Sequence, residues 1–318
     1  MKTNDVRPII AIGDADMDIF LRVERLPRRD EKVMALSHHH CPGGMAANFA
    51  SAVATLGTPS AFMGPVGDDA FGRETVADMQ RRGVDTRSVR VKPGEETFFC
   101  VVLLDQSGEK ALVLAPTSTM SPAPDELDFD AIAGAWLIHT TAHNLATGLA
   151  AAYHASANNV LVSVDLELSG LAPEDPRFDE LFALIDILFV NEHTLNVLLG
   201  QDLSLDESAR LMRQRGPTTV VITRGARGAL VAHGDEPIVY VPGFTVPVVD
   251  TTGAGDCFAA AFVHARYQGK SPTDALRFAV VAAALSVSAI GSRNALPSDA
   301  AVRAAIASIP RHAPNAHN

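Results

Sequence analysis

Residues 249–256 read Val-Asp-Thr-Thr-Gly-Ala-Gly-Asp and join an extended run to a predicted helix that begins near Asp256. Glycine and alanine let the backbone approach a ligand closely, and a helix start offers unpaired N–H groups and a positive dipole end. Such a turn can hold a phosphate or a developing negative charge. The carboxylate of Asp256 adds a group that can deprotonate an alcohol. The segment therefore predicts a site where an anion and a hydroxyl meet.

Other interpretations of this segment compete. Asp256 could simply cap the helix that follows it. Gly253-Ala254-Gly255 could begin the dinucleotide-binding fingerprint GxGxxG of a dehydrogenase, but the last position is Phe258 and the turn lies late in the chain. A Walker A loop requires GxxxxGK followed by Ser or Thr, and the sequence contains no such string. A turn that combines backbone amides with a carboxylate is therefore the preferred interpretation.

Apolar runs and helical patterns alternate along most of the chain. Buried strands are predicted at 8–13, 135–140, 160–165, 186–191 and 219–225. Helices are predicted over 145–157, 192–199 and 206–215, and near 178–184 and 298–308. This alternation predicts an α/β fold in which a mostly parallel sheet is covered by helices on both faces.

Two early segments, at about 19–40 and 95–115, depart from that alternation. Both show apolar residues with period 2, and the second contains a predicted hairpin around Gln106-Ser107-Gly108. We expect these segments to form a small β-sheet lid over the main body. The whole chain, residues 1–318, is predicted to be a single domain that carries this lid.

Composition and charge set further limits. The chain has 318 residues, of which 47% are hydrophobic and 20% charged, so it can bury a sizeable core. Its formal net charge of −11 gives no electrostatic basis for binding nucleic acid or an anionic membrane. Three scattered cysteines without CxxC spacing indicate a reducing compartment. Because no signal-like or membrane-spanning run occurs, we expect a soluble cytoplasmic protein without nucleic-acid or membrane partners.

Three further motifs accompany residues 249–256. Gly43-Gly44-Met45-Ala46-Ala47-Asn48 opens a predicted helix, Thr223-Arg224-Gly225-Ala226-Arg227-Gly228 follows a strand, and Gly13-Asp14-Ala15-Asp16-Met17-Asp18 follows the first strand. The order of the four motifs resembles that of the ribokinase-like PfkB family of carbohydrate kinases, and the resemblance spans about residues 8–308. It implies a three-layer α/β/α fold with a small β-sheet lid. It also implies ATP-dependent phosphorylation of a sugar hydroxyl.

For the reaction, the resemblance implies that Asp256 is the catalytic base and that the amides around Gly253, Ala254 and Gly255 form the anion hole. Phosphoryl transfer depends mainly on in-line positioning and on preorganised donors for the equatorial oxygens, which such a turn supplies. The implied sugar-binding residues are Asp16, Asp18, Gly43, Gly44 and Asn48. Ribokinases carry Asn at the position of Asp16, whereas Asp18 matches the family. Asn48 has the alternative of capping or packing its helix.

For the cofactors, the resemblance implies that ATP lies beside Thr223, Gly225 and Gly228. Asn191 matches the start of the family's NxxE motif, which helps to organise Mg²⁺ and phosphate, but the chain reads Asn191-Glu192-His193-Thr194. Either Glu192 substitutes for the missing Glu, or water and ATP oxygens hold most of the Mg²⁺. Candidate positions for an activating K⁺ are Asp250, Thr252, Ser286, Ala289 and Gly291.

The acceptor stays open among sugars, sugar acids and nucleosides. Ribokinases carry a sugar-binding Glu near His139, Thr141 and His143, and its absence here counts against plain ribose. Phe98 and Phe99 could stack on a nucleobase, so a nucleoside or pseudouridine kinase is the nearest alternative. From a different class, the chain could be a non-catalytic sugar-binding protein that keeps the fold. The missing NxxE Glu favours that alternative, and the intact turn before Asp256 opposes it.

The lid segments suggest two further expectations. His38, His39 and His40 are consecutive, so on a strand they point to opposite faces and cannot all bind one metal ion. We expect one of them to face the substrate instead. Alternating apolar residues, such as Ile19 and Val101, predict a sheet face that needs cover, and lid-mediated dimers occur in the family. We therefore expect a homodimer formed through the lid.

Overall fold

The computed structural model describes residues 7–106, 110–168, 172–200 and 202–308. Within these ranges the main sheet has the strand order β13-β12-β11-β10-β9-β8-β1-β4-β5. Neighbours from β5 to β11 are parallel, and only β12 and β13 run antiparallel to their neighbours. The strands are β1 (Ile9–Ile12), β4 (Ser60–Gly67), β5 (Asp85–Lys92), β8 (Leu137–Thr140), β9 (Leu161–Leu166), β10 (Ile187–Asn191), β11 (Thr219–Thr223), β12 (Ala229–His233) and β13 (Val239–Val241).

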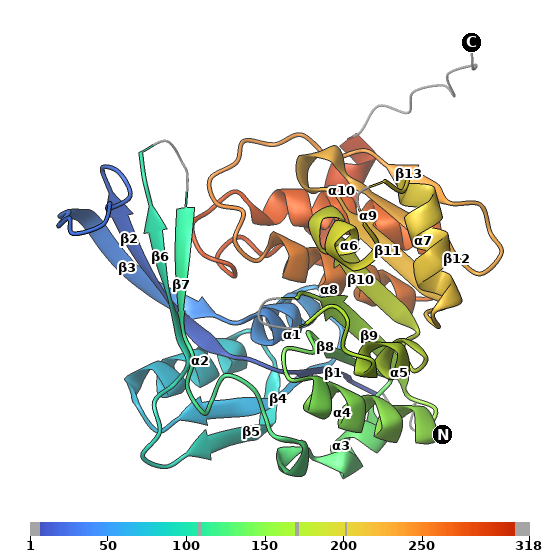
Figure 1. Ribbon diagram of the computed structural model, residues 1–318, viewed down its shortest axis with the longest axis horizontal. Helices are drawn as coiled ribbons and strands as arrows, with labels where there is room; N and C mark the ends of the chain where they lie inside the picture. Colours follow the sequence, from blue (N-terminus) through green and yellow to red (C-terminus); the bar gives the residue numbers. More distant parts are fainter. Residues whose placement is uncertain (1–6, 107–109, 169–171, 201, 309–318) are drawn as a thin grey trace.

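Helices cover both faces of this sheet, which confirms the predicted three-layer α/β/α architecture (Figure 1). In β1, Ile9 and Ala11 join the core on one face, while Ile10 and Ile12 join the core on the other, as the period of two requires. The first face carries α1 (Met45–Thr55), α2 (Ala70–Arg81), α8 (Ala254–Tyr267), α9 (Pro272–Ser286) and α10 (Asp299–Ser308). The second carries α3 (Phe129–Gly134), α4 (Leu145–Ala157), α5 (Arg177–Phe182), α6 (Glu192–Leu199) and α7 (Leu205–Gln214).

A second sheet projects from this body and has the order β3-β2-β6-β7 (Figure 1). Its strands are β2 (Asp16–Val23), β3 (Ala35–Gly43), β6 (Phe99–Leu104) and β7 (Lys110–Ala115). The predicted small lid sheet is therefore confirmed, and β6 and β7 pair antiparallel as the hairpin prediction requires. The predicted turn at 106–108 lies mostly outside the described residues.

Close packing of α1 against α8 brings two distant motifs together (Figure 1). The buried face of α1 carries Ala46, Ala47 and Ala50, and α8 offers a similar run of small residues at 259–261. Small side chains let the two helix backbones approach each other. The beginnings of both helices therefore lie beside the carboxyl end of β1, where open α/β sheets place their ligands.

Within the described residues, every helix is too short or too polar to cross a membrane.

Candidate active site

The turn that precedes α8 has the backbone geometry of a ligand loop. Gly253 adopts a left-handed conformation with φ of 75°, and a Cβ there would stand 2.6 Å from Cβ of Ser292. Only glycine fits both conditions without strain. The helix begins at Ala254, two residues earlier than predicted, so Gly255 and Asp256 lie in its first turn. The amides of this turn therefore stand at the positive end of the helix dipole, as an anion hole requires.

Asp256 is buried beside Asn48, whose Nδ2 donates to Oδ2 of Asp256 over 2.8 Å. Burial raises the pKa of Asp256 well above its usual value, although the hydrogen bond from Asn48 lowers it. The carboxylates of Asp165, Asp14 and Glu167 raise the pKa further. A carboxyl with a raised pKa is a stronger base once it is ionised, which suits general base catalysis.

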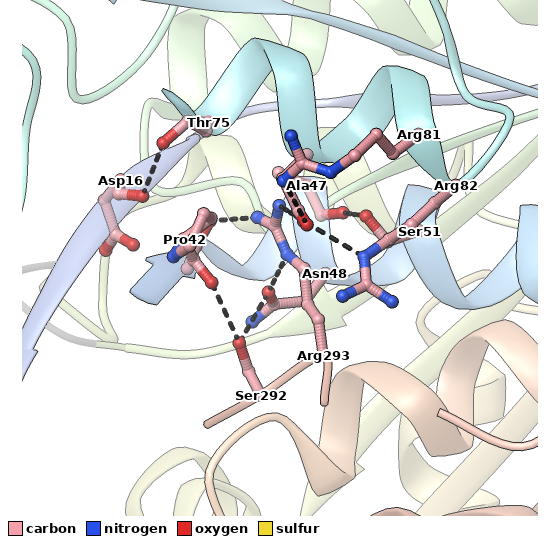
Figure 2. A network of polar contacts seen from close by, with 12 residues as sticks. Asp16, Pro42, Ala47, Asn48, Ser51, Thr75, Arg81, Arg82, Ser292 and Arg293 are labelled. Carbon is pink, nitrogen blue, oxygen red and sulfur yellow. Dashed lines mark hydrogen bonds and ion pairs between the residues drawn. The ribbon is translucent and has the colours of Figure 1, made fainter. Parts of the chain in front are cut away.

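Asn48, predicted to contact the sugar, has protein partners at both ends of its amide, and Figure 2 shows those at the oxygen end. Its Oδ1 accepts from Oγ of Ser292 at 2.9 Å and from Nε of Arg293 at 2.7 Å. Arg293 is 3% exposed and also donates to the carbonyl of Gly43 and to Oδ2 of Asp78 at 3.2 Å. The motif analysis missed Arg293, because its loop carries no signature that marks a functional residue.

The acceptor side of the site is a cluster of carboxylates beside a glycine. A Cβ at Gly43 would lie 2.3 Å from Oδ1 of Asp16 and 2.5 Å from Oδ2 of Asp18, so glycine alone leaves room for these groups. Oδ1 of Asp16 is buried without a hydrogen-bond partner. Burial raises the pKa of Asp16 well above its usual value and that of Asp18 to about 6. Unpaired buried acceptors of this kind suit the hydroxyl groups of a ligand.

Asp14, a motif residue with no predicted role of its own, links the end of β1 to the start of α1. Its two carboxylate oxygens accept from the backbone N–H groups of Met45 and Ala46 at 3.0 and 3.1 Å. Gly44 has φ of 91°, and a Cβ there would stand 2.8 Å from the backbone of Ala15. Asp14 therefore satisfies the free amides at the start of α1. Because Gly44 has no side chain, the start of that helix can lie close to the backbone that follows β1.

The predicted nucleotide side forms one cavity of about 430 Å³. Its lining includes Thr223, Gly225 and Gly228, together with Ala254 and Gly255 at the start of α8. The rest of the lining is mostly apolar, from residues Val246, Val248, Phe258, Val280 and Val287. An apolar cavity that reaches an amide-lined turn suits a nucleotide whose base lies in the cavity and whose phosphates reach the turn.

The predicted cation positions lie on two segments that meet. These are the loop of Asp250 and Thr252, and the end of α9 at Ser286 with the loop of Ala289 and Gly291 that follows it. Oδ2 of Asp250 accepts from the N–H of Gly291 at 2.9 Å, and its Oδ1 accepts from N–H and Oγ1 of Thr252 at 3.0 and 2.7 Å. Burial acts to raise the pKa of Asp250, but these hydrogen bonds outweigh it and leave the pKa lowered. Because both carboxylate oxygens are occupied, backbone carbonyls are the groups here that suit K⁺.

Asn191 and Glu192 occupy the start of α6. Oδ1 of Asn191 accepts from the N–H of Thr194 at 2.8 Å and so caps the helix. Glu192 pairs with Arg227 and lies 3.8 Å from Arg224, both in the nucleotide segment. Its charge is therefore balanced by two guanidinium groups of the loop that lines the nucleotide cavity.

Several conspicuous side chains have structural roles. His39 stacks on Phe20 while His40 lies 3.3 Å from Glu74, so these two histidines have separate neighbours. In the part of the chain that the structure describes, no group of three or more His, Cys, Asp or Glu residues could hold a metal ion. Phe98 is 3% exposed and is therefore a core residue. Burial raises the pKa of Cys257 to about 12, which leaves this thiol protonated in the core.

A further set of polar residues lies near Asp256, since the charges of Asp165 and Glu167 act on its pKa. Burial raises the pKa of Asp165 to about 6, with Glu167 adding to the shift and His143 opposing it. Both ring nitrogens of His143 are buried without a hydrogen-bond partner. His143 follows Ala142, a non-glycine residue with φ of 56°, and such strained positions cluster at functional sites. His139, by contrast, is a core residue that stacks on Phe49 and shares a hydrogen bond with Ser163.

Known proteins share this architecture over nearly the whole chain. The pfkB family carbohydrate kinase model matches residues 7–299. An ATP-dependent ribose-1-phosphate kinase of Halopiger xanaduensis is 33% identical over 92% of this chain and 96% of its own. A ribokinase of Arabidopsis thaliana is 32% identical over 91% of this chain and 78% of its own. The solved structure of an Arabidopsis thaliana ribokinase complexed with ribose and ATP has a TM-score of 0.84 at 28% identity, covering 94% of this chain and 98% of that one.

The fold and the site together define a phosphotransferase with an alcohol acceptor. The chain belongs to the pfkB family of carbohydrate kinases, and its resemblance to that family is confirmed. It is an ATP-dependent sugar kinase with a ribokinase-like fold.

Proposed function

We propose that Asp256 takes the proton from a primary hydroxyl of a small sugar or sugar derivative, which then attacks the γ-phosphoryl group of ATP. The observation that carries this proposal is the placement of a buried carboxyl between two regions. On one side lies the carboxylate of Asp16, whose charge interacts with that of Asp256, with Asp18 beside it. On the other side lies the cavity that Gly255, the residue before Asp256, lines. The amides of Gly253, Ala254 and Gly255 would stabilise the transferring group.

The acceptor would be held chiefly through its hydroxyl groups. Asp16 and Asp18 offer carboxylate oxygens, Gly43 and Gly44 give the backbone close access, and Asn48 has a second amide proton beyond the one that Asp256 accepts. Relatives of this chain include a ribose-1-phosphate kinase, ribokinases, a fructokinase and deoxyribokinases. These names support a pentose or hexose acceptor, whereas buried Phe98 removes one argument for a nucleobase.

ATP would occupy the cavity of about 430 Å³ that Thr223, Gly225 and Gly228 line. The reaction would require Mg²⁺, which neutralises charge on the phosphates. Asn191 stands near this region, since its strand partner is Thr223, and no group of three or more His, Cys, Asp or Glu residues among the described ones could hold the ion by itself. Phosphate oxygens and water would therefore supply most of the Mg²⁺ ligands.

K⁺ would bind between the loop of Asp250 and Thr252 and the segment that runs from Ser286, at the end of α9, to Ala289 and Gly291. The hydrogen bond from Gly291 to Asp250 supports this, because it holds the two loops side by side. The proposal is tested by replacing K⁺ with tetramethylammonium in the assay. A fall in kcat is expected, and an unchanged kcat would remove K⁺ from the proposed mechanism.

The protein would work as a homodimer formed through the lid. Met34, Leu36 and Val113 on or beside the lid strands are more than half exposed, which is unusual for apolar side chains unless a partner covers them. Val113→Asp is expected to shift the protein from dimer to monomer in light scattering after gel filtration. Val197→Asp on α6 is the matched control, since Val197 is similarly exposed but lies on the main body. A monomeric wild type would contradict the proposal.

A cytoplasmic location also fits three cysteines without disulfide bonds.

A panel of acceptors tests the activity directly. ADP release is measured with ribose, deoxyribose, fructose, ribose 1-phosphate, gluconate and nucleosides, each with Mg²⁺ and ATP. At least one sugar should accelerate ADP release far above the rate without acceptor. Acceleration by nucleosides alone would support a nucleoside kinase, and binding of sugars without any turnover would support a non-catalytic sugar-binding protein.

Asp256→Asn tests the mechanism. Removing a general base costs about 10²- to 10⁴-fold in rate, so kcat should fall by that factor. The amide is isosteric and can still accept the hydrogen bond from Asn48, so ATP affinity measured by calorimetry should change little. Turnover within tenfold of the wild type would contradict the role of Asp256 as base.

A further inference from the structure

The amide of Asn48 has its orientation fixed by partners from two distant parts of the chain, the start of α8 and the loop at 292–293. Nδ2 donates to Asp256 at 2.8 Å, whereas Oδ1 accepts from Ser292 at 2.9 Å and Arg293 at 2.7 Å. All four residues are at most 7% exposed, so water competes little for these contacts. Figure 2 shows Ser292 and Arg293 meeting the oxygen end of Asn48.

Only one of the two orientations of this amide satisfies its neighbours. A guanidinium nitrogen can only donate, and an ionised carboxylate can only accept. A flipped amide would place its oxygen against the carboxylate of Asp256 and its NH₂ group against Nε of Arg293. Both contacts would then be repulsive, in an interior where unpaired polar groups are costly.

Arg293 and Ser292 are themselves held firmly. Arg293 also donates to the carbonyl of Gly43 and pairs with Asp78 at 3.2 Å, so three groups fix the plane of its guanidinium. Ser292 packs where a side chain on Gly253 would stand, since a Cβ there would lie 2.6 Å from Cβ of Ser292. The same two residues therefore touch the catalytic turn, the acceptor segment and Asn48.

We propose that Ser292 and Arg293 are positioning residues for phosphoryl transfer, which hold the Asn48 amide so that its nitrogen faces Asp256. The proposal rests on the role of Asp256 as base. Loss of the donor at Nδ2 would make the ionised form of Asp256 harder to reach, because that hydrogen bond favours the carboxylate. The other charged groups that face Asp256 are the carboxylates of Asp14, Asp16, Asp165 and Glu167, and all of them disfavour a further negative charge.

The first test needs no acceptor. In the unliganded protein, the side-chain NH₂ signals of Asn48 are identified by NMR from their absence in Asn48→Ala. Hydrogen exchange of the Nδ2 protons should be at least tenfold faster in Ser292→Ala than in the wild type, because one of the two contacts on the oxygen is gone. Ser51→Ala is the control, since this buried hydroxyl one turn along α1 bonds only the carbonyl of Ala47. An exchange rate that Ser292→Ala leaves unchanged would overturn the proposal.

The second test is a double-mutant cycle on kcat, with whichever of ribose, deoxyribose and fructose gives the highest kcat/KM. Ser292→Ala should lower kcat about three- to tenfold and move the acid limb of its pH profile upward by about one unit. The same substitution should have no further effect in an Asn48→Ala background, because Ser292 acts through Asn48. An equal loss in both backgrounds would mean a merely structural role.

Arg293 is tested by Arg293→Lys and Arg293→Met, with folding checked by circular dichroism. Lysine cannot reach Asn48, Gly43 and Asp78 together, so a folded Arg293→Lys variant should show the same upward shift of the acid limb. If neither variant folds, Ser292→Ala decides the outcome. Normal turnover of Asp256→Asn would show that the proposed base is wrong. If Asp256→Asn is inactive but folded Arg293→Lys has a normal pH profile, only the positioning role is refuted.

Discussion

Asp18→Asn is expected to stabilise the unliganded protein while weakening acceptor binding. Asp18 is 7% exposed, and burial raises the pKa of its carboxyl from 3.8 to about 6. A carboxyl with a raised folded-state pKa stabilises the fold only below its unfolded pKa, and that contribution is lost as the pH rises through the folded value. The difference of about 2.2 units, at 1.36 kcal/mol per unit, corresponds to about 3 kcal/mol at pH 8. Asparagine carries no charge and so avoids this penalty.

Urea unfolding followed by circular dichroism at pH 5 and pH 8 measures the effect. The raised pKa gives the variant an excess stability that is smaller at pH 5 and approaches about 3 kcal/mol at pH 8. Asp235→Asn, at an exposed position of similar chemistry, should stay within about 0.5 kcal/mol of the wild type at both values. An Asp18→Asn variant that is no more stable at pH 8, or whose excess does not grow with pH, would refute the reasoning.

The acceptor measurement completes this prediction. A hydrogen bond to a charged group contributes about 1.5–3 kcal/mol, so the acceptor KM of Asp18→Asn should rise roughly ten- to a hundredfold. The KM for ATP should change little, because Asp18 is not among the residues that line the nucleotide cavity. If Asp18→Asn is more stable but binds the acceptor more weakly, the buried carboxylate of Asp18 lowers the stability of the fold while it serves acceptor binding.

Two glycine substitutions test the geometry of the site. Gly43→Ala would bring a methyl group within 2.5 Å of the carboxylates of Asp16 and Asp18. The acceptor KM should therefore rise at least tenfold, while ATP binding is retained. An unchanged acceptor KM would contradict the placement of the acceptor. Gly253→Ala should destabilise the fold by about 1–3 kcal/mol in urea unfolding and lower kcat, since φ is 75° and Ser292 blocks the Cβ. Gly255→Ala is its control for stability, because a Cβ there meets nothing within 4 Å, and an equal loss of stability in both variants would contradict the argument.

Local sequence patterns predicted the elements of the fold well. The helices predicted over 145–157 and 192–199 have those bounds in the structure, and the lid segments form their own sheet. Such predictions succeed because periodicity, capping residues and glycines act over a few neighbouring positions. The four motifs in order also identified the family, which the match over residues 7–299 confirms.

The hydrogen-bond and ion-pair partners of individual side chains were not predicted from the sequence. Asn48 was predicted to contact the sugar, and the structure adds that it binds Asp256, 208 positions away, and Arg293, 245 positions away. Glu192 was considered for Mg²⁺, and the structure shows it paired with Arg227. Neither Asp14 as the group that meets the start of α1 nor Arg293 as a buried link was foreseen.

The sequence by itself determined most of the strands and helices, though not β5, and also the class of enzyme and the carboxylate at the start of α8. Tertiary structure alone decided how that carboxylate is surrounded. The packing of alanine-rich α1 against α8 sets the distance from Asn48 to Asp256, and a loop near the C-terminus delivers the guanidinium that fixes the amide. These contacts join segments that are distant in the sequence, and local sequence patterns do not predict such contacts. The pKa of Asp256, and with it the basicity of this carboxylate, therefore follows from the fold as a whole.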